Sequence, residues 1–378
     1  MVLISSVVSV AAVVASSFGV ATAHPHPKAG SVEAVKLENF NALARRSLGN
    51  CQDQLRKRGG VYERAHARRE ALAHKARREL GISMPRGLFK RDLDTVLNTT
   101  HHSDLTGVTQ NSDAATLFTG NNSCILAPET TQGPYYVDGE FVRSDIREDQ
   151  QGVDLYVDVQ LIDVTTCEPV PNVFIDFWHA NSTGVYAGVV ANGNGDSTNE
   201  NNWNTTFLRG IQETNEDGVA QFLTVFPGHY TSRATHIHIL AQENGTQFDN
   251  GTYKATDVKH VGQFFFDQDL ITEVEATSPY STNTQTLTTN AEDSIMSDEA
   301  ATIDPVLEYV LLGEDVSDGI FAWGAMGINV TASYDISSAA TLTESGGVEN
   351  PHSGMGGGPG GPSGTVSGTA PASTASSA

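Results

Sequence analysis

The segment Phe226–Leu240 carries the residue types best suited to chemistry, because its second half places polar side chains at alternate positions. Successive side chains of a β-strand point to opposite faces, so His236 and His238 share one face of a predicted strand. Two imidazoles about 6–7 Å apart along the backbone can bind one metal ion. Tyr230 and Arg233 lie six and three residues before His236. Without further support, the same pattern fits a half-buried strand with two hydrogen-bonded histidines.

A second stretch, Val173–Val190, predicts a strand that ends at Trp178 and a glycine-containing loop that holds Tyr186. By itself it fits a core tryptophan and a loop aromatic equally well. Together the two stretches contain, in order, a Trp-x-Ala-Asn turn, a Gly-x-Tyr loop, a Pro-Gly-x-Tyr loop and an Arg-x-x-His-x-His strand. A Gly-Pro-x-Tyr turn precedes them within Leu126–Arg143. The ordered set is more specific than any of its motifs.

Over residues 118–335 this ordered set resembles the intradiol ring-cleaving dioxygenases, the family of the catechol and protocatechuate dioxygenases, and most closely its secreted fungal branch. The resemblance implies an oxidoreductase that uses O₂ to open a small aromatic diol between its hydroxyls, giving a muconate-type diacid. It also implies a non-haem Fe(III) cofactor held by two tyrosines and two histidines. Matched motif by motif, these metal ligands are Tyr186, Tyr230, His236 and His238.

The resemblance further implies roles for residues around the metal. Tyr230 would leave the metal and accept a substrate proton, and Arg233 would stabilise negative charge on the ring. Gln263 matches a glutamine that borders the iron site, and Trp178 would pack behind the ligands. The link between Tyr230 and His236 is shorter than in bacterial members, so the preferred diol stays open. No dimerisation helix is evident, so the oligomeric state stays open as well.

The donor types agree with a ferric site. Phenolate is a hard anionic donor that favours Fe(III), and a tyrosine with a pKa of about 10 ionises only beside a strong positive charge. Two phenolates and one hydroxide would neutralise a trivalent ion, and neutral imidazoles would complete the site. A site of two histidines and one carboxylate fits less well, because the alternating strand offers no carboxylate at that spacing. Tyr135 and Tyr136 are alternative ligands, although the two later loops match the family better.

Two other functions stay open on the sequence alone. The first is an inactive secreted β-sandwich that binds the cell wall through a basic arm. The second is a copper or zinc hydrolase that uses His236 and His238. Iron content and O₂ uptake with catechol separate these from a dioxygenase.

The 378-residue chain opens with an uncharged segment that is rich in Val, Ala and Ser. Residues 1–23 end in a small-residue cleavage pattern, which predicts a secretory signal rather than a membrane anchor, and no other stretch could span a bilayer. Seven Asn-x-Ser/Thr sequons favour an extracellular glycoprotein. The net charge of −23 hides a basic segment, residues 24–91, before an acidic body that disfavours nucleic acid as a partner. The basic segment could bind an anionic wall or membrane, or dock on the acidic body.

The chain around these motifs predicts one all-β domain, a β-sandwich over residues 118–335. A polar linker covers residues 92–117, and residues 336–378 read as a disordered tail of Gly, Ser, Thr and Pro. Helices are expected over residues 33–58 and 62–80, with a weaker helical pattern at 291–309. The predicted strands cover residues 153–164, 173–178, 219–226, 235–241, 259–266 and 329–334.

Three cysteines predict one disulfide in an oxidising compartment. Cys124 and Cys167 form the favoured pair, because both border the same predicted sheet. The dibasic pair Lys90–Arg91 marks residues 24–91 as a candidate propeptide. Its removal would discard Cys51 and leave an even number of cysteines.

Overall fold

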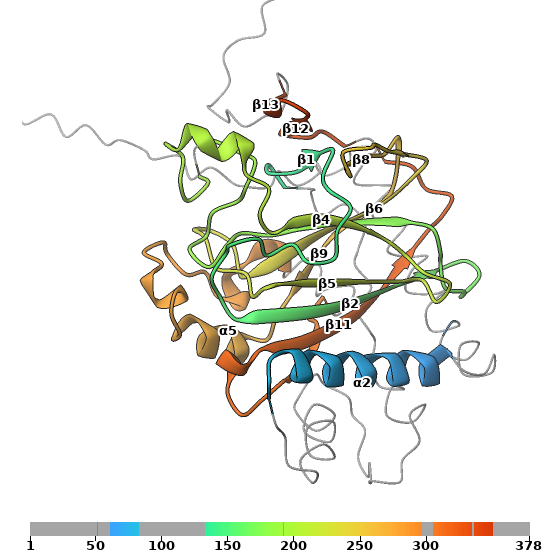
Figure 1. The fold of residues 1–378 in the computed structure, drawn as a ribbon, viewed down its shortest axis with the longest axis horizontal. Coiled ribbons are helices and arrows are strands. Elements are labelled where there is room, and N and C mark those ends of the chain that lie inside the picture. The colour runs from blue at the N-terminus through green and yellow to red at the C-terminus, as the bar shows by residue number, and fades with distance from the viewer. Residues whose placement is uncertain are drawn as a thin grey trace, which may run out of the picture.

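The structure, a computed structural model, describes residue 51 and residues 61–82, 133–191, 193–296, 305–334 and 336–350. Two four-stranded sheets form the body of the domain, with strand orders β10-β11-β2-β5 and β4-β3-β6-β9 (Figure 1). The first sheet contains β2 (Asp154–Asp163), β5 (Val219–Val225), β10 (Glu308–Leu311) and β11 (Ile320–Ile328). The second contains β3 (Phe174–Trp178), β4 (Arg209–Glu213), β6 (His236–Glu243) and β9 (Asp257–Phe265).

Apolar side chains from both sheets fill the space between them. Val157 of β2 and Ile237 and Ile239 of β6 are fully buried in one cluster. Burying side chains of this size contributes about 1.5–3 kcal/mol each. The predicted β-sandwich is therefore confirmed. Because the isoleucines face the core, the alternating His236 and His238 lie on the outward face of the second sheet.

The strand predictions were largely correct in the core and failed at the C-terminal strand. Five predicted strands correspond to β2, β3, β5, β6 and β9, whereas β4, β10 and β11 were missed. The strand expected at residues 329–334 is wrong, because Asn329 starts a turn in which its side-chain oxygen accepts from the amide and hydroxyl of Thr331. The helical pattern expected at 291–309 is wrong at its end, since β10 begins at Glu308.

Residues 336–350 contain ordered strands, so the predicted start of a disordered tail at residue 336 is wrong. β12 (Ala340–Thr343) pairs with β13 (Gly346–Glu349) and, in parallel, with β1 (Val137–Asp138). Ala340 is fully buried, and Leu342 packs against the same apolar cluster. These two apolar side chains anchor a segment whose composition otherwise suggests disorder. The signal segment, the first predicted helix apart from Cys51, the linker and residues 351–378 lie outside the described residues.

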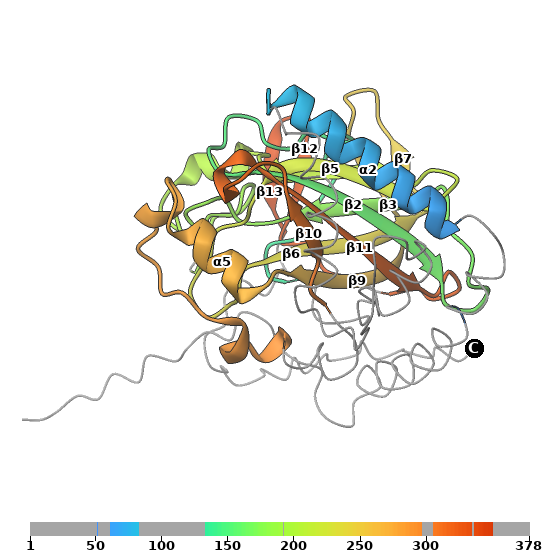
Figure 2. The ribbon, with the colours of Figure 1, turned by 90° about the horizontal axis from the view of Figure 1, so that it is seen from below.

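The second predicted helix is confirmed as α2 (Val61–Glu79), which lies along the outer face of the first sheet (Figures 1 and 2). Ala76 is fully buried in a cluster with Trp323 of β11. Arg68 donates from Nε and Nη2 to the two carboxylate oxygens of the buried Asp158, at 2.9 and 3.0 Å. α2 therefore contacts the acidic body, which is one of the partners predicted for the basic segment. No helix in the described ranges is long and apolar enough to cross a membrane.

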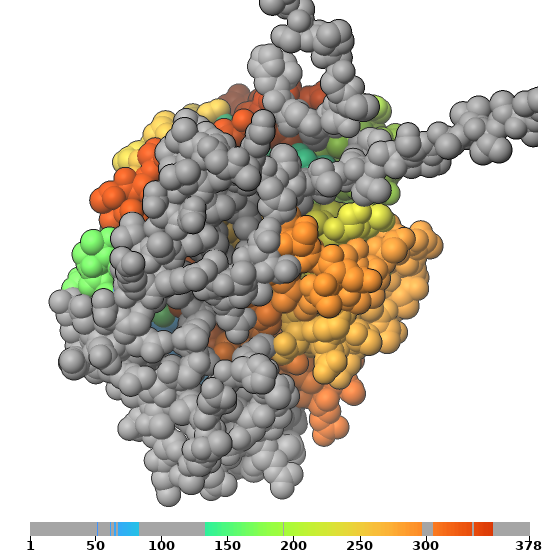
Figure 3. Space-filling view, turned by 180° about the vertical axis from the view of Figure 1, so that it is seen from behind, coloured from blue at the N-terminus to red at the C-terminus, as the bar shows by residue number. Residues whose placement is uncertain are grey.

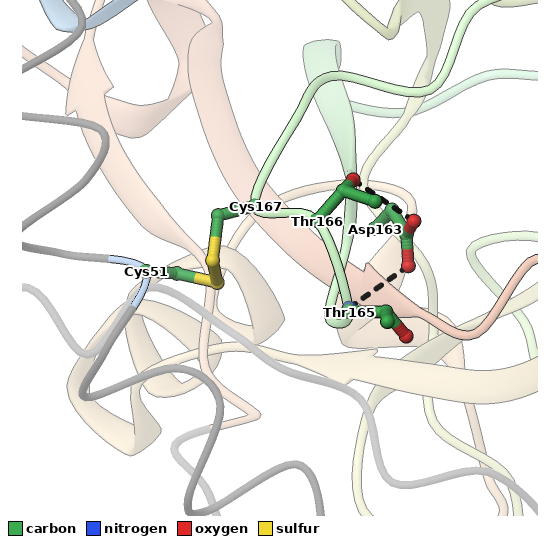
Figure 4. The surroundings of a disulfide bond; sticks show 5 residues. All are labelled: Cys51, Asp163, Thr165, Thr166 and Cys167. Atoms are coloured by element: carbon green, nitrogen blue, oxygen red, sulfur yellow. Dashed lines mark hydrogen bonds between the residues drawn. A yellow bond between two sulfur atoms is a disulfide. The ribbon is translucent and has the colours of Figure 1, made fainter.

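The disulfide joins Cys51 to Cys167, not Cys124 to Cys167 as predicted (Figure 4). Cys167 ends a turn after β2 in which Asp163 accepts hydrogen bonds from Thr165 and Thr166. The start of α2 lies at this end of the sheet, because Arg64 pairs with Asp217 in the turn before β5. Docking of the basic segment therefore brings Cys51 to Cys167, whereas Cys124 lies outside the described residues.

A helical segment follows β9 and packs beside the loops that connect the second sheet. It contains α5 (Gln268–Glu275) and the short 3₁₀ helices η2 (Tyr280–Thr282) and η3 (Asn290–Glu292). Figure 3 shows this segment in orange on the side of the molecule that faces away in Figure 1. The remaining elements are η1 (Glu200–Asn204), η4 (Val316–Asp318), β7 (Thr246–Gln247) and β8 (Tyr253–Lys254).

Candidate metal centre

The predicted histidine pair opens β6 on the outward face of the second sheet. The neighbouring strands place Trp178 of β3 and Gln263 of β9 directly opposite His238. The Nε2 atoms of His236 and His238 lie 3.0 Å apart. Both side chains are almost fully buried. The strand therefore presents two adjacent nitrogen donors in a site that solvent barely reaches.

The two predicted tyrosine ligands bring their hydroxyls to the same point. The Oη of Tyr230 lies 3.2 Å from Nε2 of His236. The Oη of Tyr186 lies 3.4 Å from Nε2 of His236 and 3.2 Å from Nε2 of His238. Donors that bind one ion at about 2.0–2.1 Å and at angles near 90–110° are themselves about 2.9–3.4 Å apart. The four donor atoms therefore fit a single metal ion.

The protonation states of the cluster also suit a cation. His236 donates from Nδ1 to the carbonyl of Ala234 at 2.6 Å, which leaves the Nε2 lone pair facing the phenols. Burial, reinforced by His236, holds the pKa of His238 well below its usual range. Burial also raises the pKa of Tyr186 well above its usual value and raises that of Tyr230. A metal ion among these donors would lower the pKa of both phenols, because its positive charge stabilises the phenolates.

At this site tyrosine oxygens accompany the two histidines, in the place of the more common Cys, Asp, Glu or further His ligands. Within the part of the chain that the structure describes, no group of three or more His, Cys, Asp or Glu side chains is placed to hold a metal. Phenolates are hard donors, and the donor set of two phenols and two imidazoles fits the predicted Fe(III).

The glycines of the tyrosine motifs allow the two ligand loops to touch. Gly228 lies so close to the other loop that a Cβ there would come within 2.5 Å of the carbonyl oxygens of Asn181 and Ser182. Gly184 has a φ of +79°, which favours glycine, and a Cβ there would clash with the carbonyl of His229. The motifs Gly-x-Tyr and Pro-Gly-x-Tyr therefore encode both a ligand and the close approach of its loop.

Arg233 and Gln263 lie beside the donor atoms, as predicted. Arg233 places Nη1 3.4 Å from Nε2 of His236 and donates from Nη2 to Oε1 of Gln263 at 2.6 Å. Burial lowers the pKa of the Arg233 guanidinium, but Tyr230 and Asp293 raise it and the net direction is upward. The structure therefore places a buried, charged guanidinium at the edge of the cluster.

Three aromatic residues of the predicted site pack around the donors. Trp178 stacks on His238, with ring centroids 4.9 Å apart and an interplanar angle of 4°. The ring of Tyr135 lies 4.9 Å from that of Tyr186, and the ring of Tyr136 lies 5.3 Å from that of Trp178. Tyr135 and Tyr136 thus contact the site through their rings, while Tyr186 and Tyr230 supply the oxygens that meet the imidazoles.

Several residues that hold the Tyr186 loop were missed from sequence. Asn194 accepts from the amide of Tyr186 at 2.8 Å, and Asn202 donates to the carbonyl of Tyr186 at 2.8 Å. The buried Arg209 donates to the carbonyl of Ala187 at 2.9 Å. The two asparagines lie in a polar stretch that reads as an ordinary exposed loop, so composition gives no signal for their burial.

Comparison with known proteins supports the class that this geometry suggests. Residues 130–275 match the family described as Dioxygenase. The β-sandwich, the Tyr–Tyr–His–His cluster and this match define a dioxygenase. The matched residues include all four donors of the cluster, and dioxygenases are oxidoreductases.

Solved structures similar to the chain include three of this class. An intradiol ring-cleavage dioxygenase from Tetranychus urticae has 29% identity and a TM-score of 0.47, covering 56% of this chain and 98% of that chain. The dioxygenase domain of a carbohydrate-binding fusion protein from Streptomyces sp. SirexAA-E has 22% identity and a TM-score of 0.33, covering 54% and 98%. Catechol 1,2-dioxygenase from Pseudomonas arvilla C-1 has 17% identity and a TM-score of 0.32, covering 53% and 61%. No curated protein matches the chain.

Proposed function

We propose that this protein is a secreted non-haem Fe(III) dioxygenase that opens catechol-type aromatics between their two hydroxyls and forms muconate-type diacids. The observation that carries the proposal is the convergence of two phenol oxygens and two imidazole nitrogens, with neighbouring donors 3.0–3.4 Å apart. A ferric ion held by Tyr186, Tyr230, His236 and His238 would supply the Lewis-acid activation of a bound catechol toward O₂.

The residues around the donors supply the remaining steps. We assign to Tyr230 the acceptance of one catechol proton, as the family resemblance implies. Arg233 turns Nη1 toward the donor cluster and would stabilise negative charge that builds on the ring during attack. Gln263 holds the second amino group of Arg233, and Trp178 supports His238 by stacking. Burial of these groups in a low-dielectric site strengthens each electrostatic contribution.

Metal analysis combined with oxygen uptake tests the proposal. Purified protein should contain iron, show a reddish tyrosinate-to-iron absorption that dithionite bleaches, and consume O₂ with catechol. Product analysis over a panel of substituted catechols would identify the preferred diol. Bound zinc or copper without O₂ uptake would favour a hydrolase instead. A folded, iron-free protein that adheres to cell walls would favour a binding module.

Secretion is a separate part of the proposal. It is supported by the apolar residues 1–23 and by the disulfide between Cys51 and Cys167, a bond typical of oxidising compartments. Of the sequons, Asn250 is exposed, whereas Asn181 is half-buried and its amide nitrogen donates to Gln150. Protein recovered from the medium should start near residue 24 or 92 and carry glycan at Asn250 rather than Asn181. Retention inside the cell would contradict secretion.

A further inference from the structure

Asp293 lies beyond the segment that matches the family and reaches back to the metal centre. It follows η3, whereas the match ends at residue 275. Its side chain is 1% exposed. Neighbouring Ile295 packs in an apolar cluster with Ala234 and Phe265, which docks this part of the chain against the start of β6 and the end of β9. The segment thus brings a carboxylate to the site from outside the residues that match the family.

Both oxygens of Asp293 are fully engaged. Oδ2 accepts from Nε of Arg233 at 2.8 Å and from the amide of Ala234 at 2.7 Å. Oδ1 accepts from the amides of Ile295 and Met296 at 2.8 and 2.9 Å. The two amides on Oδ1 fix the carboxylate, and the fixed carboxylate holds the Nε edge of Arg233. Such a charge-assisted contact between buried groups is strong and directional.

The Nη1 and Nη2 atoms of the same guanidinium lie on the side of the metal site. Nη2 donates to Gln263, and Nη1 lies 3.4 Å from Nε2 of His236. An arginine side chain has many rotamers, so its orientation at a site must be supplied by its partners. Asp293 anchors one edge of Arg233 and Gln263 anchors the other, which leaves Nη1 directed at the donor cluster.

We propose that Asp293 is a positioning residue, which holds Arg233 in the orientation that stabilises negative charge on the substrate ring. The proposal rests on the function proposed above for Arg233. Asp293 itself touches no metal ligand side chain in any contact described here; it acts through Arg233. Misplacing a charge-stabilising group by about 1 Å can cost about 100-fold in rate. Loss of Asp293 should therefore lower kcat without removing the metal.

The first test compares Asp293→Asn in two backgrounds, using the iron-loaded full chain. The substitution keeps an acceptor for Ile295 and Met296 but loses the charge that faces Arg233. With catechol, D293N should lower kcat and kcat/KM together by about 10- to 100-fold. Iron content and the visible spectrum should stay those of the unaltered protein. In an Arg233→Ala background the same substitution should cause no further loss. Equal losses in both backgrounds, or loss of iron, would show that Asp293 only supports folding and would overturn the proposal.

A matched control and a second variant keep the test decisive. Asp318 also caps a turn, by accepting from the amides of Glu314 and Asp315, but it lies in η4, in the connection between β10 and β11 of the first sheet. Asp318→Asn should leave kcat unchanged. If D293N does not fold, Asp293→Glu keeps the charge and shifts its position, and it should lower kcat only when Arg233 is present. A loss from Asp293→Glu that persists without Arg233 overturns the proposal.

A separate measurement distinguishes failure of this inference from failure of the proposed function. In the iron-free protein, the Arg233 Nε–H signal in NMR should be protected from exchange, and D293N should remove the protection. If the unaltered protein cleaves no catechol, the proposed function fails, while loss of protection would still support the positioning of Arg233 by Asp293. An Nε–H signal that D293N leaves unchanged would overturn the inference whatever the activity.

Discussion

Tyr186 and Tyr230 occupy unequal places in the donor cluster, and their substitutions should differ. The hydroxyl of Tyr186 contacts both imidazoles, at 3.4 and 3.2 Å, whereas that of Tyr230 contacts His236 at 3.2 Å. Tyr186→Phe should therefore lose iron and activity together. Tyr230→Phe should keep part of its iron but slow turnover by about 10²- to 10⁴-fold, the usual range for loss of a general base. Iron content and kcat, measured on the same samples, check both. Unchanged turnover in Tyr230→Phe would remove it from proton transfer.

A buried acidic residue beside the site predicts a pH dependence of stability. Glu140 is 1% exposed, and Nε of Arg209 lies 3.7 Å from its carboxylate. Among the described residues, neither carboxylate oxygen of Glu140 has a hydrogen-bond partner. Burial raises the pKa of Glu140 from 4.5 to about 7. The folded-state pKa of Glu140 lies above the unfolded one. Its contribution to the free energy of unfolding is therefore fully present below pH 4.5 and is lost as the pH rises through 7.

Glu140→Gln should remove the contribution of Glu140 to this dependence, while that of the buried Asp176, whose pKa burial also raises, should stay. The loss in the unaltered protein amounts to ~3 kcal/mol of unfolding free energy across the window. Denaturant unfolding at several pH values between 4 and 8 measures it, and the variant should give a flatter curve. The exposed Glu216, changed to Gln, is the matched control and should leave the curve as it is. A Glu140→Gln curve as steep as that of the unaltered protein would show that other groups set the dependence.

At the scale of elements, Gln285 ties together the two loops that carry the tyrosines. Its amide nitrogen donates to the carbonyls of Thr183 and Gly184 in the Tyr186 loop, and its amide oxygen accepts from the amide of Thr231 in the Tyr230 loop. Its carbonyl contacts Nε2 of His229 at 3.0 Å. The segment between η2 and η3 therefore clamps the ligand loops from outside the sandwich.

Gln285→Leu keeps the size of the side chain and removes its three side-chain hydrogen bonds, while the backbone contact with His229 stays. Leaving the part-buried carbonyls of Thr183 and Gly184 without this donor should cost about 1 kcal/mol of unfolding free energy. Iron should also dissociate faster when a chelator is added, because the two ligand loops lose their common anchor. Gln212→Leu is the control, since the amide of Gln212 donates only to its neighbour Ile211 among the described contacts. Iron release at the original rate would mean that packing alone holds the loops.

The sequence predicted elements with strong alternation and the motif residues they carry. β6 is the clearest case, because Ile237 and Ile239 alternate with His236 and His238 and the burial follows that alternation. β11 was missed because it reads Ile-Phe-Ala-Trp-Gly-Ala-Met-Gly-Ile, an almost continuous apolar run with two glycines and no polar alternation. Such a run is typical of a strand buried on both faces, and α2 covers the outer face here.

The parts of the site that depend on distant contacts could not be read from sequence. Nothing local to Asp293 or Gln285 distinguishes them from residues of an exposed polar loop. Their roles arise because the chain after β9 returns to the ligand loops, at a separation of 60 residues between Asp293 and Arg233. The pairing of Cys51 was missed for the same reason, because its partner depends on where α2 docks. Tertiary placement, rather than residue type, decided each of these outcomes.

At the scale of the whole molecule, the disulfide joins the basic segment to the catalytic domain. The bond between Cys51 and Cys167 spans 116 residues of sequence. In the chain-entropy model, closing a loop of about 100 residues stabilises the folded protein by about 4–5 kcal/mol. The ion pair of Arg68 with Asp158 holds α2 on the same sheet. Within the basic segment, Cys51 and α2 are therefore both attached to the folded domain.

This linkage changes what cleavage at Lys90–Arg91 would do, a site that lies outside the described residues. Protein cut there should migrate as one band on a denaturing gel without reductant and as two bands after reduction. Cys51→Ser, cut in the same way, should give two bands under both conditions, because no covalent bond remains between Cys51 and Cys167. Uncut Cys51→Ser should also unfold at lower denaturant concentration, by up to about 4–5 kcal/mol. Release of the basic segment from the unaltered protein without reductant would show that the two cysteines are not joined, and the segment would then act as a removable propeptide.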